Sequence, residues 1–216
     1  MCIRDSFHTA VPALCLAGLA VCGLFLAIAV DRGTGLIPQA PRVDALSTAQ
    51  FGRALAGGDG YHYTPGSEAA IPPSHLHAAL TGGAWLFGLR GALNGAFTFA
   101  FSAFCFLVTI FAVRSLFRGL YPRCAETAAL FAALSGSTAF AAFLLDEVIL
   151  FTALVLLCFA VAALGRVRWL YLLLPAVVLA RPEGVLLPAV LCLLTVSPAY
   201  RTKAHVCVMR LSLIHI

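Results

Sequence analysis

The sequence has little charge for its length. Only 11% of its 216 residues are Asp, Glu, Lys or Arg, whereas soluble domains carry about 25%. Its basic residues are scattered, which excludes the clustered positive stripe of a nucleic-acid-binding surface. The stretch Ala10–Val30 contains no charged side chain, no carboxamide and no hydroxyl. This composition does not fit an ordinary soluble domain, and we expect no nucleic-acid partner.

The patterns of metal sites and disulfide frameworks are also missing. The chain has eight cysteines, but they form no Cys-x-x-Cys pair, and none lies in the polar segment Asp31–Ser74. His75 and His77 are two positions apart, so on a helix they would not share a face. The sequence therefore predicts no metal site. A divalent cation stays open as a cofactor but is not indicated.

Long apolar stretches fill most of the chain. Hydrophobic residues make up 62% of it, and its mean hydropathy is +0.98. A bilayer core about 30 Å thick needs about 20 apolar residues per helix. The expected spans are Ala10–Val30, Asn94–Val113, Thr127–Leu145, Val148–Leu164, Trp169–Ala180 and Val185–Val196. We expect an all-α polytopic transmembrane bundle of about six spans, of which the last two are short.

The two ends of the chain differ in origin from the rest. MCIRDS at 1–6 and LSLIHI at 211–216 back-translate into DNA strands that are reverse complements of each other. They resemble the adaptor ends left by transposon-made sequencing libraries, and such scars are excluded from fold reasoning. We expect residues 7–210 to be authentic and to form the N-terminal part of a longer protein.

Basic residues gather at alternate ends of successive spans. Arg114, Arg118 and Arg123 follow the second expected span, and similar groups follow the fourth and the sixth. Such groups are typical of cytoplasmic loops, and most acidic residues fall on the opposite side. We expect a plasma-membrane (bacterial inner-membrane) protein with a cytoplasmic N-terminus. The loop Asp31–Ser74 would then be extracytoplasmic.

This loop contains signals for two short helices. Asp44 precedes a helix-forming stretch that Gly57-Gly58 should stop, as expected of a helix with an acidic N-cap. Ser74 is placed to cap a second helix over His75–Leu80. The first helix is expected to lie at the membrane surface. Thr81–Gly83 and the apolar AWLFGL beyond are expected to form an interfacial or re-entrant segment, with Trp85 at headgroup depth.

The segment Arg181–Gly184 reads RPEG and separates the last two apolar stretches. Pro182 lacks the amide hydrogen that a continuous helix would use. Two interpretations fit, namely an extracytoplasmic turn between short helices and one long helix broken at mid-membrane. The second would bury Arg181 and Glu183 at about 2.5–3.5 kcal/mol each, so the turn is favoured.

Four features, in this order, resemble a known family. An acidic residue opens the loop helix, a Gly-x-Gly-aromatic turn precedes Pro-Gly-x-Glu, an acidic pair precedes the fourth span, and RPEG follows. The set resembles the GT-C glycosyltransferases, which use polyprenyl-phosphate sugars. The likeness is greatest to the bacterial dolichyl-phosphate-mannose-type and arabinofuranosyltransferase-like branch. The family loop commonly reads DDAFxxxRYAxNLxxGxGxxxNPGExxEGYT, and VDALSTAQFGRALAGGDGYHYTPGSEAAIPP follows it from Val43 onward.

Three positions depart from the family pattern. Val43 stands where the first carboxylate of an acidic pair usually falls, and Gln50-Phe51-Gly52 replaces the family's RYA. Leu145-Asp146-Glu147-Val148 replaces a Gly-x-Glu-Thr. The first departure leaves two alternatives. Either Asp44 is the base, or the base belonged to position 43 and this protein is a divergent or inactive member.

The resemblance implies sugar transfer from a polyprenyl-phosphate donor to a cell-envelope glycan, lipid or protein acceptor. No cofactor is required, because phosphate is already a good leaving group. Asp44 would be the general base, and Arg181 would contact the donor phosphate bidentately. The supporting residues would be Glu147, Asp146 and Glu183, and the sugar would lie on Tyr61 and Tyr63.

Each role has a structural alternative. Asp44 fits a simple N-cap worth about 1 kcal/mol, Arg181 and Glu183 fit a structural ion pair, and Asp146-Glu147 fits a solvated turn. The two tyrosines also fit interfacial anchors. For the whole protein, a transporter component and a non-catalytic scaffold or truncated remnant stay open. A transporter is disfavoured because no expected span carries a charge at mid-membrane.

Overall fold

A computed structural model describes residues 43–62, 70–143 and 147–196. Within them the chain is all helical and contains no strand, which confirms the predicted all-α class for this part. Ala10–Val30, Tyr63 and Asp146 lie outside the described residues, as do the two adaptor-like ends. The helices are α2 Val43–Gly57, α3 His75–Leu86, α4 Ala92–Leu120, α5 Ala125–Ala133, α6 Gly136–Phe143, α7 Glu147–Ala163, α8 Leu170–Ala180 and α9 Leu186–Val196.

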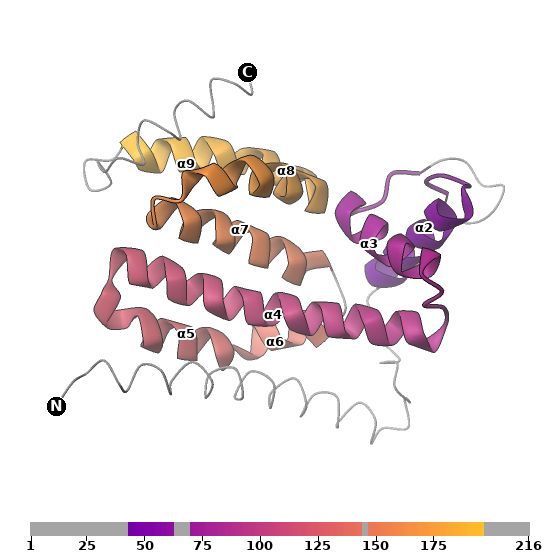
Figure 1. Cartoon of the computed structure of the whole chain (residues 1–216), viewed down its shortest axis with the longest axis horizontal. Helices are drawn as coiled ribbons and strands as arrows, with labels where there is room; N and C mark the ends of the chain where they lie inside the picture. The colour runs from indigo at the N-terminus through magenta and orange to yellow at the C-terminus, as the bar shows by residue number, and fades with distance from the viewer. Residues whose placement is uncertain (1–42, 63–69, 144–146, 197–216) are drawn as a thin grey trace.

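Helices α4 to α9 form an up-and-down bundle (Figure 1). In the view of Figure 1, α5 and α6 appear below α4 and α7 above it, with α8 and α9 beyond α7. α6 also contacts α7, so α5 and α6 are not separated from α7 by α4. One apolar cluster joins α4 to α7 around Phe106, Ile110 and Ile149. A second joins α7 to α9 around Cys158 and Val177. The pair α2 and α3 lies at the end of the bundle where α4 begins (Figure 1).

Helix α4 is longer than the predicted span Asn94–Val113. Within its 28 residues Leu93–Leu120, the most apolar stretch of 18 residues has a mean hydropathy of 2.3, and among the described residues this is the one helix long and apolar enough to cross a bilayer. Glu147–Ala163, Val167–Ala180 and Pro182–Cys192 are shorter apolar helical stretches.

The predicted span Thr127–Leu145 is not one continuous helix. α5 ends at Ala133 and α6 begins at Gly136. Ser135 causes the break, because its Oγ accepts hydrogen bonds from the backbone N–H of Thr138 at 3.4 Å and from the Thr138 hydroxyl at 2.9 Å. Such local bonds favour a helix start over a helix interior. The two pieces still run in the same direction as a single arm (Figure 1).

The RPEG segment is a turn, as the sequence favoured. The 3-10 turn η4 (Pro182–Val185) reverses the chain, and α8 and α9 run side by side in opposite directions (Figure 1). Gly184 makes this reversal compact, because a Cβ there would lie 2.6 Å from Val177 Cγ1 and 2.7 Å from its carbonyl oxygen.

Helices α2 and α3 cross at two glycines. A Cβ on Gly82 would lie 2.6 Å from the carbonyl oxygen of Gly52, and a Cβ on Gly52 would lie 2.8 Å from the backbone nitrogen of Gly82. The two backbones are therefore in direct contact. This crossing explains the Gly52 that departs from the family's RYA. It also explains why Thr81–Gly83, expected to begin a separate interfacial or re-entrant segment, instead continues α3.

An ion pair ties α4 to α5 at the opposite end of the bundle. Arg114 Nη2 lies 2.6 Å from Glu126 Oε1, and Arg114 Nε donates to the same carboxylate at 2.8 and 3.1 Å. Both side chains are partly buried. This pair explains why Glu126 is the one acidic residue among the basic residues of that side.

Candidate functional site

Polar side chains from three elements gather at one end of the bundle, which we call the α3 end. Leu76 and Leu80 of α3 pack against the apolar cluster that contains Ile149 of α7 and Ala180 of α8. Helix α3 therefore lies beside α8, and Figure 1 shows the start of α7 at the same end of the bundle. The chemistry-bearing residues next to these contacts are His77, Glu147 and Arg181.

Arg181 follows α8 in an extended conformation, with φ −154° and ψ 138°. Its Cζ lies over the Phe151 ring at 6.0 Å from the centroid. Arg181 Nε lies 3.4 Å from Glu183 Oε2, and Nη2 donates to Oε1 at 3.5 Å. These distances are long for a charge-assisted bond, and Glu183 is 60% exposed. The guanidinium is thus loosely held and accessible to another anion.

Glu147 opens α7 and is only 3% exposed. A carboxylate in the first turn of a helix is favoured by the helix dipole. A carboxylate buried this deeply also needs hydrogen-bond donors or a cation around it. Phe151, one turn further along α7, carries the Arg181 guanidinium on its ring. The acid and the guanidinium therefore lie at the same end of α7, where the sequence hypothesis had grouped them.

His77 is a further candidate residue at the α3 end, and its burial there was not predicted from the sequence. It is 2% exposed and lies on the buried face of α3 with Ala78 and Thr81. Its backbone N–H donates to Ser74 Oγ at 3.1 Å, which is the predicted helix cap. The predicted cap places His77 in the first turn of α3, but the buried face of the helix is set by its tertiary contacts.

The remaining predicted residues divide into two groups. Asp44 lies in the first turn of α2, which begins at Val43, two residues before the predicted start at Ala45, so Asp44 is inside the helix and is not its N-cap. Its side chain is outside the description. Tyr61 is half-buried, and its ring meets the His75 ring edge-on at a centroid distance of 5.3 Å. Tyr61 therefore lies beside α3. Tyr63 and Asp146 are not described.

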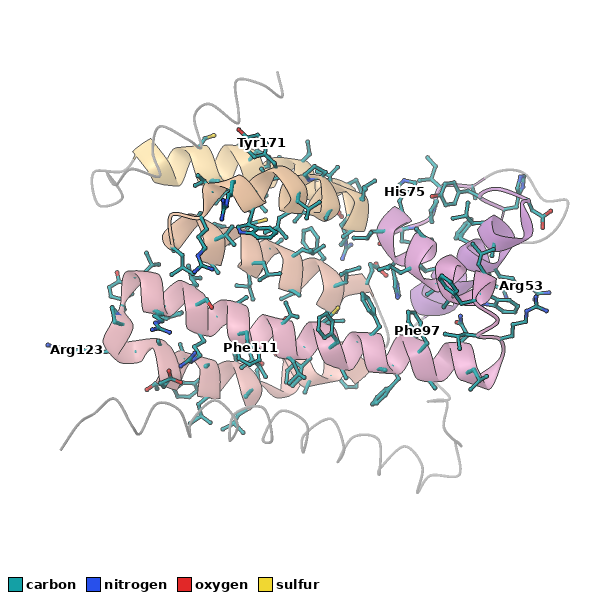
Figure 2. The ribbon with its side chains drawn as sticks, viewed as in Figure 1. Arg53, His75, Phe97, Phe111, Arg123 and Tyr171 are labelled. Carbon is teal, nitrogen blue, oxygen red and sulfur yellow. The ribbon has the colours of Figure 1, made fainter. Side chains whose placement is uncertain are left out.

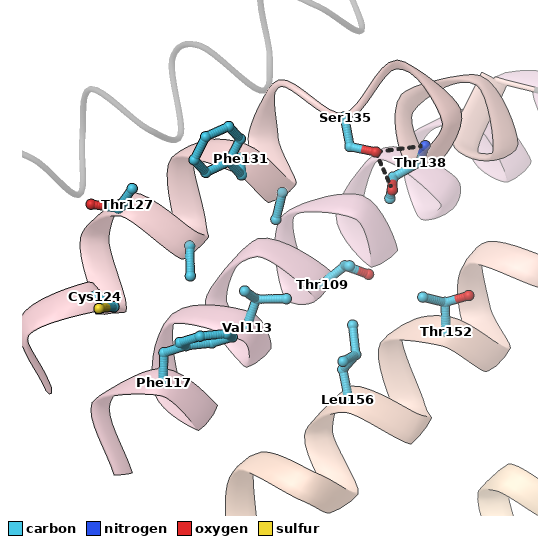
Figure 3. A pocket seen from close by; sticks show the side chains of 12 residues that line it. Thr109, Val113, Phe117, Cys124, Thr127, Phe131, Ser135, Thr138, Thr152 and Leu156 are labelled. Atoms are coloured by element: carbon cyan, nitrogen blue, oxygen red, sulfur yellow. Dashed lines mark hydrogen bonds between the residues drawn. The ribbon is translucent and has the colours of Figure 1, made fainter. Parts of the chain in front are cut away.

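An apolar groove of about 620 Å³ lies between α4, α5, α6 and α7 (Figure 3). Five hydroxyl-bearing residues line it, but two of them bond to their own helices. Thr109 Oγ1 donates to Cys105 O at 2.9 Å, and Thr152 Oγ1 donates to Val148 O at 2.8 Å. These two threonines therefore leave no free hydroxyl hydrogen for a ligand. The groove starts near Thr152, five positions after Glu147.

No group of three or more His, Cys, Asp or Glu side chains that could hold a metal ion occurs in the described ranges. No protein-family model, curated protein or solved structure matches the chain.

Proposed function

We propose that the bundle is embedded in a membrane. Its interior is made largely of small residues, while large apolar side chains point outward. Phe104 is 60% exposed, Phe131 73% and Leu172 67%. The buried alanines of the bundle include Ala112, Ala125, Ala129, Ala133, Ala139, Ala142, Ala153 and Ala160. Small residues at helix contacts and apolar side chains outside are typical of bundles in lipid.

In this proposal the described bundle crosses the membrane five times, and the apolar stretch Ala10–Val30, predicted from the sequence, makes the sixth span. α4 makes the first described pass, the arm α5–α6 the second, and α7, α8 and α9 the rest. With the N-terminus in the cytoplasm, the α3 end faces the extracytoplasmic side. The basic residues around Arg118 and Arg123 then lie at the cytoplasmic end. α8 and α9 have 11 residues each, so they cross only with their flanking turns or where the bilayer is thin.

The protein's function in this proposal is that of a GT-C-type glycosyltransferase. It moves a sugar from a polyprenyl-phosphate donor to an extracytoplasmic acceptor in the cell envelope. One observation carries the proposal. α3 packs on α2, the helix of Asp44, and also contacts α8, which Arg181 follows, while Glu147 opens α7 at the same end of the bundle. A base candidate and a phosphate-binding candidate are thereby attached to one end of one bundle.

The proposed reaction uses these residues as follows. The acceptor hydroxyl attacks the anomeric carbon and gives its proton to the Asp44 carboxylate. The bond between the anomeric carbon and the phosphate oxygen breaks as the new glycosidic bond forms. Negative charge then builds on the departing polyprenyl phosphate, where the Arg181 guanidinium stabilises it. Glu147 orients Arg181 or binds a sugar hydroxyl. Tyr61, beside α3, offers a ring face to the sugar.

The apolar groove gives the polyprenyl chain a place in this scheme. It begins on the Glu147 side of α7 and extends between α4 and α5 toward Phe117. Its volume of about 620 Å³ lies within the usual range for ligand pockets. The chain would lie among apolar side chains while the phosphate stays at the α3 end.

Asp44→Asn is expected to lower turnover of polyprenyl-phosphate sugar by about 10²–10⁴-fold, because an amide cannot accept the proton. Turnover is measured in membranes that contain the chain, and extraction at alkaline pH checks that both proteins stay inserted. Asp59→Asn is the matched control, because Asp59 is exposed just after α2. Equal turnover by the Asp44 variant and the parent would contradict the base assignment. Absence of turnover from the parent as well would favour a non-catalytic scaffold.

A further inference from the structure

We propose that the Trp85 surface, formed by Arg53, Trp85, Leu86, Phe87 and Arg90, binds the headgroups of anionic phospholipids. This surface lies on the α2–α3 pair, and nothing in the catalytic proposal uses it. The inference rests on the proposed embedding of the bundle in a bilayer.

Two arginines flank one tryptophan in this surface. Arg53 Cζ lies over the Trp85 ring at 5.5 Å from its centroid, and Arg90 Cζ lies over it at 5.9 Å. Arg53 comes from α2, whereas Arg90 comes from the segment between α3 and α4. The glycine crossing between α2 and α3 brings the first arginine to the tryptophan of the other helix. The cluster is thus built by tertiary structure and not by neighbouring positions alone.

Both guanidiniums are available to an external anion. Each arginine is exposed, and within the described ranges neither has a carboxylate at ion-pair distance. Figure 2 shows Arg53 extending outward from the α2–α3 pair. Stacking on an aromatic ring occupies the face of a guanidinium but leaves the N–H donors at its edge free. Those donors match phosphate oxygens.

An apolar tip adjoins the two arginines. Leu86 is 72% exposed and Phe87 is 88% exposed, directly after Trp85. α4 begins at Ala92, two residues after Arg90, and Leu93 is 60% exposed. The tip is therefore continuous with the start of the longest apolar helix.

A bilayer surface fits this combination of side chains. Tryptophan is enriched at headgroup depth, exposed Leu and Phe enter the acyl region, and unpaired arginines above them meet lipid phosphates. Position along the chain favours lipid over an acidic protein partner, because the surface immediately precedes a membrane-spanning helix. The selected lipids should carry net negative charge, since two cations face them and neither forms an ion pair with a carboxylate of the described residues.

The test uses tryptophan fluorescence of the full chain in phospholipid nanodiscs. The sequence has two tryptophans, so Trp169→Phe leaves Trp85 as the single reporter. Phosphatidylglycerol or phosphatidylcholine, each brominated on its acyl chains, is added at the same mole fraction. We expect stronger quenching of Trp85 by the brominated phosphatidylglycerol. The preference should reach about fivefold per arginine, because each basic residue contributes about that factor near an anionic surface.

Variants separate the arginine effect from general charge. Arg53→Gln with Arg90→Gln should remove the preference and leave quenching by brominated phosphatidylcholine in place. Arg166→Gln with Arg168→Gln, both exposed near Trp169, should leave the preference unchanged. Equal quenching by the two lipids in the parent, or a preference that survives the Arg53 and Arg90 changes, would overturn the proposal. A Trp85 shielded from both lipids and from aqueous acrylamide would indicate a protein partner and overturn it as well.

The other tryptophan distinguishes this inference from the membrane proposal. In a Trp85→Phe chain, Trp169 reports on the opposite end of the bundle, where it is 49% exposed. Quenching of Trp169 by either brominated lipid, together with no quenching of Trp85, rejects the lipid surface while the membrane proposal stands. Absence of quenching at both tryptophans rejects both.

Discussion

Gly82→Ala should destabilise the protein by about 1–3 kcal/mol, the usual cost of an extra methyl group in a closely packed contact. The new Cβ would lie 2.6 Å from the carbonyl oxygen of Gly52. Neither backbone can yield without moving a whole helix, so α2 must separate from α3. Thermal unfolding of the purified protein, followed by circular dichroism, measures the change in stability.

Gly83→Ala is the matched control and should act in the opposite direction. A Cβ at Gly83 meets nothing within 4 Å, and alanine is favoured over glycine inside a helix by about 0.5–1 kcal/mol. The two variants differ by one position in the same helix and add the same methyl group. Equal effects of the two changes on stability would show that α2 and α3 do not touch at Gly52 and Gly82. Under the proposed function, Gly82→Ala should also lower sugar transfer, because it separates the Asp44 helix from α3. Gly83→Ala should leave sugar transfer unchanged.

Arg181→Lys should lower sugar transfer by about 10²–10³-fold, as expected when a donor to developing negative charge is removed. Lysine keeps the positive charge but cannot grip phosphate through two parallel N–H bonds. The lysine ammonium also cannot stack on the Phe151 ring as the planar guanidinium does, whose Cζ lies 6.0 Å from the ring centroid. Turnover of polyprenyl-phosphate sugar by inserted protein measures the loss.

Glu183→Gln separates this role from a structural ion pair. Glu183 is 60% exposed, and its oxygens lie 3.4 and 3.5 Å from Arg181 nitrogens. An exposed pair of this kind contributes about 0–1 kcal/mol. If Arg181 binds the donor, Arg181→Lys reduces transfer while Glu183→Gln leaves it nearly unchanged. If the pair is only structural, both variants shift the melting temperature slightly and neither changes transfer.

Local signals in the sequence predicted several elements correctly. Gly57-Gly58 mark the end of α2, and Gly58 has a φ of +85°. Ser74 caps α3, and RPEG forms a turn. Each of these depends on residues within a few positions, where the physical chemistry of caps and turns acts directly.

Sequence reasoning missed one local signal and two features that depend on long-range packing. The Ser135 break was missed because the apolar run Thr127–Leu145 looks uniform by hydropathy, although Ser135 and Thr138 carry the signal of a new helix start. Gly82 was assigned to a separate interfacial or re-entrant segment, because only its contact with α2 explains a glycine at this position inside α3. The burial of His77 also follows from tertiary contacts.

The grouping of the site residues was only partly accessible. The alternation of apolar spans and polar turns places the start of α7 and the end of α8 at the same end of a bundle. Glu147 and Arg181 are therefore expected at that end. This alternation does not say which helices are neighbours. The packing of α3 on α8, and of its Leu76 and Leu80 against the cluster that contains Ile149 and Ala180, supplies that information. The role of Asp44 as the base remains a prediction from the resemblance.

The central claim is that the helix of Asp44 and the Arg181 turn share the extracytoplasmic face of a membrane-embedded bundle. Labelling of single cysteines with a membrane-impermeant maleimide tests it directly, in a chain whose other cysteines are replaced by alanine. Asp59→Cys and Glu183→Cys, both at exposed positions, should react in intact cells. The exposed native Cys124, at the far end of the bundle, should react only after the membrane is opened. Labelling of Asp59→Cys and Glu183→Cys from opposite sides would contradict the account.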